Sequence, residues 1–193
     1  VARFASQFDV PDDLESVPAD LAPEDRWLLA EFQQTMHTVK EAWSNLDIYT
    51  ATQALKTFGT GLLPSHYLEM VKSRLYDDDG AAAWTLHRTV RDFMAAFSPV
   101  CPFFTHHISS TVYGSSAVDV DAFPAPALGE VDHGTEEGAR LCALSHDLQE
   151  FNGQTWAAKK ERGISLNQPI EGIAVPKELA EFEVTLTRMH QLT

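Results

Sequence analysis

The sequence predicts an all-α protein built as an antiparallel helical bundle. Apolar residues recur at steps of three and four along several long segments, which is the period of a helix buried on one face. Tyr67, Val71 and Leu75 form one such stripe, with Met70 beside them. The sequence contains no series with the alternating period of a strand, and prolines and glycines separate the helical segments. The 193 residues, 44% of them hydrophobic, suffice for one domain with or without a small appendage.

In the first half of the chain we expect a helix end followed by three long helices. Pro23 and the acids after it favour the start of a helix, and Asp47 is a good N-cap for the next. Two glycines and a proline should weaken or kink this second helix before the helical period resumes. The expected segments are a helix end at 1–8, a helix from 23, a helix from 47 weakened at Gly59, Gly61 and Pro64 and resuming over 64–76, a turn at 77–80, and a helix over 81–98.

The second half should contain a shorter helix, a loop and further helices. We expect a helix over 102–112 closed by Gly114, a loop over 115–134 with at most a short extended piece, and a long helix from about Thr135 to Arg162 that Gly163 stops. A small irregular or β-like segment near 164–175 and a last helix opened by Pro176 follow. The chain thus divides into a core bundle (1–114), a loop (115–134), and C-terminal helices with an extended segment packed on the bundle (135–193).

The charge of the chain is strongly negative but unevenly distributed. A formal charge of −14 argues against a nucleic-acid binder when it is averaged over the chain, because phosphate contacts dominate such binding. Residues 1–25 contribute a net charge of −6. By contrast, Lys159, Lys160 and Arg162 surround the single acid Glu161, so a local basic island lies at a predicted helix end.

Other features of the composition indicate a cytoplasmic protein. No apolar run approaches the roughly 18 residues of a membrane span, so we expect no membrane association. Cys101 and Cys142 have no metal-binding spacing and are expected to be reduced, buried thiols. The chain opens at Val1, without a methionine, in a sequence typical of the middle of a helix, which suggests a fragment of a longer protein.

Motifs for catalysis are absent from the sequence. It has no glycine-rich phosphate loop. His106 and His107 are adjacent and would point about 100° apart on a helix, so they do not make a metal site; a His-based metalloenzyme would need the fold to unite three or more ligands. The groups that remain are aromatic rings for stacking and cations for phosphate, which suit unpaired RNA. They are Arg26 with Trp27, Lys72 with Arg74, Arg88 with Arg91, and Trp156 with Lys159, Lys160 and Arg162.

An ordered set of motifs covers nearly the whole chain. The motifs are VARF (1–4), EDRWLL (24–29), HYLEMVK with RLY (66–76), WTLH (84–87), FSPVCPFFT (97–105) and KERGISLN (160–167). Together they resemble the anticodon-binding helical domain of valyl-tRNA synthetase, a class I aminoacyl-tRNA synthetase, in its archaeal-like form. The isoleucyl, leucyl and methionyl enzymes share this bundle, but the segments at 66–76 and 165–167 favour the valyl enzyme.

This resemblance implies that the chain grips the anticodon side of tRNA(Val). The parent ligase would use ATP and Mg in a catalytic domain of the same chain and would also carry an editing domain. We expect no catalytic residue, metal or cofactor within this part. The alternatives are the same domain of an isoleucyl or leucyl enzyme, or an acidic helical protein-interaction module without RNA binding. The expected tRNA contacts are Arg3, Phe4, Arg26, Trp27, Lys159, Lys160 and Arg162.

Overall fold

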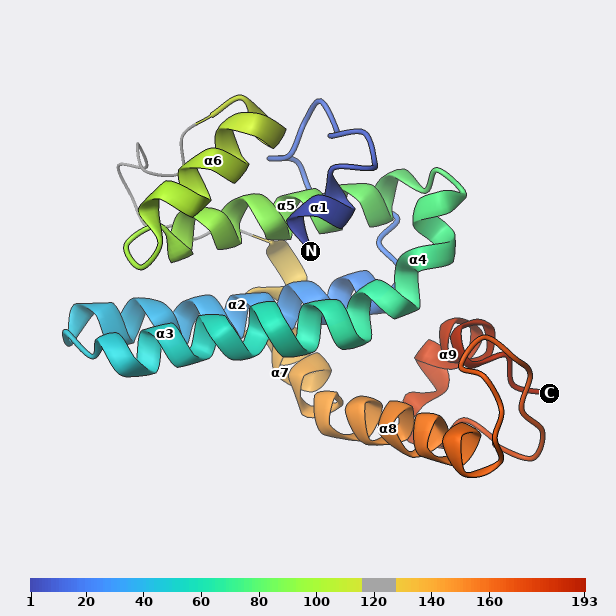
Figure 1. The fold of residues 1–193 in the computed structure, drawn as a ribbon. Helices are drawn as coiled ribbons and strands as arrows, with labels where there is room; N and C mark the ends of the chain where they lie inside the picture. Colours follow the sequence, from blue (N-terminus) through green and yellow to red (C-terminus); the bar gives the residue numbers. More distant parts are fainter. Residues whose placement is uncertain (116–127) are drawn as a thin grey trace.

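A computed structural model describes residues 1–115 and 128–193, and this described part forms helices and turns without a sheet. Two antiparallel helices lie side by side at its centre, and a second layer of helices lies above them (Figure 1). The prediction of an all-α antiparallel bundle is therefore confirmed. The central pair is α2 (Pro23–Ser44) and α3 (Ile48–Thr57), and the second layer contains α5 (Gly80–Phe97), α6 (Pro102–Tyr113) and the short α1 (Ala2–Ala5).

Helix boundaries in the first half of the chain follow the capping signals. Pro23 occupies the first turn of α2, followed by two acids that interact favourably with the positive end of the helix dipole. Asp47 caps α3 by accepting a hydrogen bond from the backbone N–H of Thr50 at 3.0 Å. Gly114, with φ of +65°, closes α6. These three predicted boundaries are confirmed.

The second helix changes geometry where its glycines and proline lie. Phe58–Tyr67 is a π-helical segment, η1, between α3 and α4 (Leu68–Tyr76). Gly59 lets α5 pack closely, because a Cβ atom there would lie 2.6 Å from Cζ of Phe93 and would displace that ring. Pro64 has no backbone N–H and cannot complete a regular helical ladder. The wider π turns accommodate both residues, and the chain then continues into α4, which rises towards the second layer (Figure 1).

The predicted apolar stripe lies in the core. Tyr67 and Val71 have no exposed surface, and Met70 and Leu75 are each 2% exposed. They pack in one continuous cluster with buried residues of α2, α3 and α5. Burial of a large apolar side chain stabilises the fold by about 1.5–3 kcal/mol, so this stripe contributes strongly to holding α4 in the bundle.

The helix predicted from Thr135 to Arg162 is interrupted, so that prediction is wrong in its continuity. It consists of α7 (Glu136–Ala143) and α8 (Ser145–Glu161), which meet at Leu144. Leu144 donates its backbone N–H to Leu141 three residues back, which ends α7 as a tight turn. At this point α8 turns away from α2 (Figure 1). Gly163, with φ of +66°, follows the end of α8 as expected.

The C-terminal segment is irregular and then helical. Within the predicted irregular segment at 164–175, Ile170 forms an isolated parallel bridge with Leu192, which matches the expected small β-like element. The last helix starts after Pro176 but begins as a 3-10 helix, η3 (Lys177–Phe182), before α9 (Glu183–His190). A guanidinium joins this region to α7, because Arg140 pairs with Glu181 at 2.6 Å.

Most of the loop predicted over 115–134 lies outside the described residues, namely 116–127. In the described remainder, Gly129–Val131 forms a 3-10 turn, η2, where at most an extended piece was expected. Over residues 1–115 and 128–193, no helix combines the length and apolar character needed to cross a membrane.

A buried ionic network joins the N-terminal ends of α2 and α5 to α4. The guanidinium of Arg74 on α4 pairs with Glu24 at 2.9 Å, with Asp25 at 2.8 Å and with Asp79 at 2.8 Å. Tyr67 donates its hydroxyl to Asp25 at 2.8 Å. Asp79 also caps α5, because it accepts the N–H of Ala82 at 3.0 Å. The Arg74 cation therefore fixes the positions of α2, α4 and α5 relative to one another.

Burial and ion pairing act in opposite directions on the pKa values of this network. It raises the pKa of Asp25 to about 6, although the hydrogen bonds from Arg74 act in the opposite direction. For Arg74 burial would lower the pKa, but the carboxylates of Asp79 and Asp25 outweigh it and raise the pKa. With a pKa of about 6, the Asp25 carboxyl is mostly ionised at neutral pH beside the charged Arg74.

Removing the central cation should destabilise the fold strongly. We expect Arg74→Met to lower the free energy of unfolding by roughly 3–5 kcal/mol, because it leaves buried carboxylates uncompensated. Urea unfolding followed by circular dichroism measures the loss. Lys72→Met is the matched control: within 1–115 and 128–193, Lys72 pairs only with the half-exposed Glu69, at 3.6 Å, so its loss should stay below about 1 kcal/mol. Equal losses in the two variants would contradict the assigned role of Arg74.

Candidate nucleic-acid interface

The residues predicted to contact RNA fall in three separate places. Arg3 and Phe4 lie on α1, where Arg3 is exposed and Phe4 is half-buried. The ring of Phe4 packs edge-on against Phe8 and Tyr76, with centroids 5.1 and 6.4 Å apart. Arg26 on α2 pairs with Glu137 at 2.7 Å and with Glu130 at 3.5 Å. Its charge is therefore partly neutralised within the protein.

Trp27 is not available for stacking, so the prediction that it contacts RNA is wrong. Its side chain has no exposed surface. The indole Nε1 donates to the hydroxyl of Ser145 at 2.7 Å, and that hydroxyl in turn donates to Glu31. This chain of bonds ties the start of α8 to α2. Trp27 therefore packs the core and satisfies its polar atom inside it.

Lys159 is also buried, which overturns its prediction as a phosphate contact. Its ammonium group donates to the backbone carbonyls of Leu166 and Gln168, at 2.7 and 2.8 Å. Burial lowers the pKa of this lysine. The side chain thus fastens the turn after α8 to the helix. Lys160 and Arg162 remain exposed, and Arg162 also donates to the carbonyl of Glu171 at 2.9 Å.

An apolar groove lies beside these two exposed cations. It is about 450 Å³ in volume and has a largely apolar lining. Trp156 and Lys160 form one side on α8, and Ile164 and Leu166 form the other on the following turn. Leu166 is 55% exposed. Trp156 was noted in the sequence as an aromatic near the basic island, whereas Leu166 carried no sequence signal apart from its place in the KERGISLN motif.

A hydrogen-bonded relay supports the ring of Trp156. His190 of α9 donates its Nε2–H to the side-chain Oδ1 of Asn152 at 2.8 Å. The side-chain Nδ2 of Asn152 donates to Nδ1 of His66 at 3.2 Å. Both imidazoles lie 5.7 Å from Trp156, centroid to centroid. These contacts join η1, α8 and α9. Sequence reasoning missed the relay because its members are far apart in the chain and each is a lone polar residue.

One side-chain group in the described residues has the composition of a metal site. His146, Asp147 and Glu150 place their ligand atoms within 4.8 Å of one another on α8. All three are exposed, and exposed acidic groups commonly adopt such spacing without an ion. His106 and His107 are not part of it.

Comparison with known proteins identifies the family. Residues 25–174 match the family described as the anticodon-binding domain of tRNA ligase. The chain belongs to this family. This confirms the resemblance found in the sequence motifs and the anticodon-binding type of its helical bundle.

Relatives of this anticodon-binding domain are valine–tRNA ligases of archaea. The protein from Pyrobaculum aerophilum is 31% identical over 202 residues, which cover 100% of this chain and 24% of that protein. The Aeropyrum pernix protein is 31% identical and covers 99% of the chain and 24% of its own length. The Saccharolobus solfataricus protein is 30% identical over 154 residues, with 79% and 18% covered. The chain thus spans about a quarter of the first of these relatives, at 24%.

The relay that supports Trp156 should make the stability of this anticodon-binding domain depend on pH. Burial, helped by the Lys159 cation, lowers the pKa of His190 to about 4 from its ordinary 6.5. As pH falls, His190 therefore takes up a proton near pH 6.5 in the unfolded chain but only near pH 4 in the folded chain. Stability contributed by neutral His190 is complete above pH 6.5 and is lost as pH falls to about 4, a loss of about 3 kcal/mol.

Urea unfolding of the native chain and of His190→Gln across this pH range measures the effect. We expect the native chain to lose more stability towards low pH than the variant. Asp25 contributes in the opposite direction, but it is present in both proteins, so its contribution cancels when the two are compared. His146→Gln is the control, because His146 is an exposed histidine on α8, the helix that carries Asn152 of the relay. A pH dependence in His190→Gln as steep as in the native chain would refute the assignment.

Proposed function

We propose that the chain recognises the anticodon side of tRNA(Val) within a valine–tRNA ligase. The observation that carries this proposal is the match of the whole chain to valine–tRNA ligases at 31% identity. The family assignment supports tRNA as the ligand. The alternatives, an isoleucyl or leucyl enzyme, share the bundle type, but the relatives found support the valyl assignment.

The surface chemistry of the α8 end supports an RNA partner. Lys160 and Arg162 are exposed cations beside the half-buried ring of Trp156. Cations neutralise phosphates, and an aromatic face can stack on an unpaired base. Several other guanidiniums are engaged by carboxylates of the protein, including those of Arg26, Arg74, Arg88, Arg91 and Arg140. At the end of α8, by contrast, Lys160 and Arg162 are not paired with carboxylates of the described residues and are available to bind phosphate.

The remaining steps of the reaction belong to other parts of the proposed ligase. In this proposal the catalytic domain activates valine with ATP and Mg, and an editing domain belongs to the same chain. The cytoplasm is the compartment in which such a ligase would meet its tRNA. The relatives are about four times as long as this chain, which leaves room for those domains.

Charge reversal at the α8 end tests the proposal. In Lys160→Glu/Arg162→Glu, we expect weaker binding of tRNA(Val) and a salt dependence that is flatter by roughly one to two phosphate contacts. Fluorescence anisotropy titrations at several salt concentrations measure both. The matched control is Lys72→Glu/Lys177→Glu, which changes the net charge equally at exposed lysines that do not line the groove beside Trp156. Equal effects in the two double variants, or native binding no tighter than to an unrelated hairpin RNA, would reject the proposal.

A further inference from the structure

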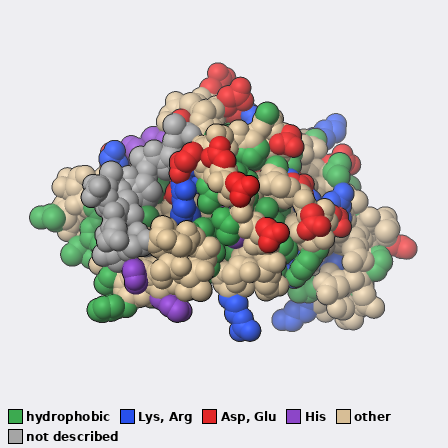
Figure 2. Space-filling model, turned by 90° about the horizontal axis from the view of Figure 1, so that it is seen from above, with side chains coloured by type: hydrophobic (Ala, Val, Ile, Leu, Met, Phe, Trp, Pro, Cys, Tyr) green, Lys and Arg blue, Asp and Glu red, His purple; other side chains and the backbone are tan. Residues whose placement is uncertain are grey.

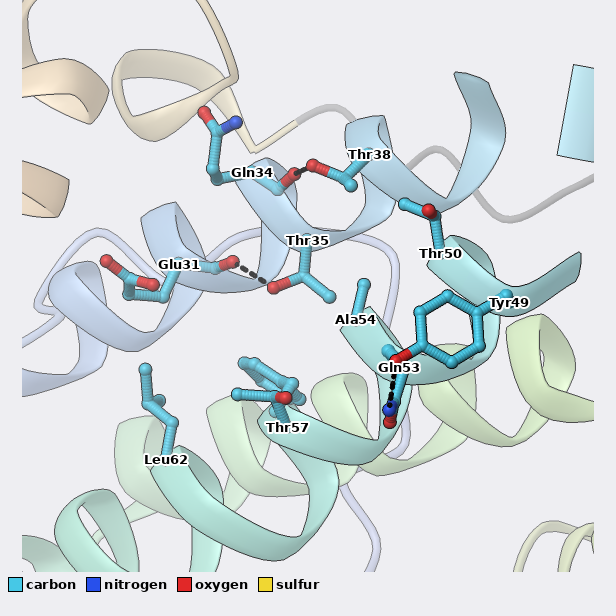
Figure 3. A pocket seen from close by; sticks show the side chains of 11 residues that line it. Glu31, Gln34, Thr35, Thr38, Tyr49, Thr50, Gln53, Ala54, Thr57 and Leu62 are labelled. Atoms are coloured by element: carbon cyan, nitrogen blue, oxygen red, sulfur yellow. Dashed lines mark hydrogen bonds between the residues drawn. The ribbon is translucent and has the colours of Figure 1, made fainter. Parts of the chain in front are cut away.

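A groove with almost entirely uncharged walls lies between the two central helices (Figure 3). Its volume is about 540 Å³, within the range typical of small-ligand sites. Thr35 and Thr38 of α2 face Gln53 and Thr57 of α3 across it. Figure 3 shows Tyr49 at one end of the groove and Leu62 towards the other. The α8 end described above is a different surface, with no lining residue in common.

The polar groups of the groove are arranged to receive hydrogen bonds. Thr35 and Thr38 donate their hydroxyl hydrogens to carbonyls of their own helix, those of Glu31 at 2.8 Å and Gln34 at 3.1 Å. Each hydroxyl oxygen keeps acceptor capacity that can face a ligand. The amide of Gln53 donates to the Tyr49 hydroxyl at 3.2 Å. This bond positions the phenol ring although 74% of Tyr49 is exposed.

The rim beside Tyr49 presents apolar side chains at some conformational cost. Leu46 and Ile48, in the turn between α2 and α3 and at the start of α3, are 85% and 60% exposed. Leu46 has φ of +57°, a left-handed conformation that is unfavourable for a branched, non-glycine side chain. An exposed leucine held in this conformation contributes little to the core. Its position suits a surface that a partner covers.

The charge of the groove selects its ligand. Among the described residues that line it, none is lysine or arginine, and Glu31 is the one acid. The Glu31 carboxylate accepts a hydrogen bond from Ser145. A phosphate or another anion would find no cation here and would be repelled by Glu31. A planar, neutral ligand with polar edges fits the aromatic face of Tyr49 and the neighbouring hydroxyls and amides.

We propose that this α2–α3 groove binds an unpaired base of the tRNA, stacked on Tyr49 with its edge against Gln53 and the threonine hydroxyls. This inference rests on the proposed function and extends it. Single-stranded RNA is read by stacking on aromatic rings and by hydrogen bonds to base edges. Phosphate contacts position an RNA without reading its sequence. The α8 end therefore positions the RNA, and the groove reads one base.

Paired substitutions at Tyr49 test the groove. The 193-residue chain is titrated by fluorescence anisotropy with the anticodon stem–loop of tRNA(Val) and with versions lacking one loop base each. We expect Tyr49→Ala to weaken binding of the intact loop by roughly 5- to 150-fold, the value of one stacked base, and Tyr49→Phe to keep most of the affinity. With the abasic loop that lacks the docked base, Tyr49→Ala should cause no further loss.

The control and the contrary outcomes separate this proposal from the previous one. Phe103→Ala removes a ring that is 92% exposed on α6, outside the groove, and should leave binding unchanged. If Tyr49→Ala binds every loop as the native chain does while Lys160→Glu/Arg162→Glu still weakens binding, the groove proposal is overturned and the proposed function stands. If the native chain does not prefer this stem–loop to an unrelated hairpin, both are overturned.

Discussion

The fold depends on the single guanidinium of Arg74. Its three carboxylate partners come from the first turn of α2 and from the N-cap of α5, so the cation fixes where both helices begin relative to α4. Asp25 is fully buried and could not remain ionised without it. The buried stripe of α4 then determines which face of the helix points inwards. Because α3, α7 and η2 all pack against α2, the placement of α2 decides where the α2–α3 groove opens and where α7 starts.

The acidity of the chain looks different once its ion pairs are known. Arg74, Arg88 and Arg140 each pair with carboxylates, so much of the positive charge serves the fold. Acidic side chains are spread over the face seen in Figure 2, with several of the visible lysines and arginines near its margin. Such a surface repels a polyanion over most of its area. In the proposed function, RNA therefore contacts this domain at cations that are not paired with carboxylates, or through a neutral base.

Sequence patterns predicted the elements that depend on local signals. The apolar stripe of Tyr67, Val71 and Leu75, the caps at Asp47 and Gly114, and the stop at Gly163 each follow from a short window, and each is confirmed. The failures depend on distant partners. Trp27 is satisfied by Ser145, 118 positions away, and Lys159 by a turn whose backbone carbonyls face the helix. The spacing of apolar residues in the sequence cannot show whether a cation or an aromatic ring is exposed or is buried with its polar atom bonded to a distant partner. The groove did leave a signal, since Tyr49 and Gln53 lie four residues apart on one helix face, next to threonines.

Two kinds of contact on one acidic domain solve a physical problem that neither solves alone. Cations attract any phosphate, so a surface made basic enough to bind strongly would also bind other RNAs. A neutral groove gains nothing from the phosphate charge and therefore responds only to the shape and edge of a base. Because several arginines pair with carboxylates of the protein, unspecific attraction of RNA is weakened, and in our proposal the preference for one RNA comes from the groove. Acidity elsewhere on the surface then favours specificity, because it penalises every RNA that cannot place a base between α2 and α3.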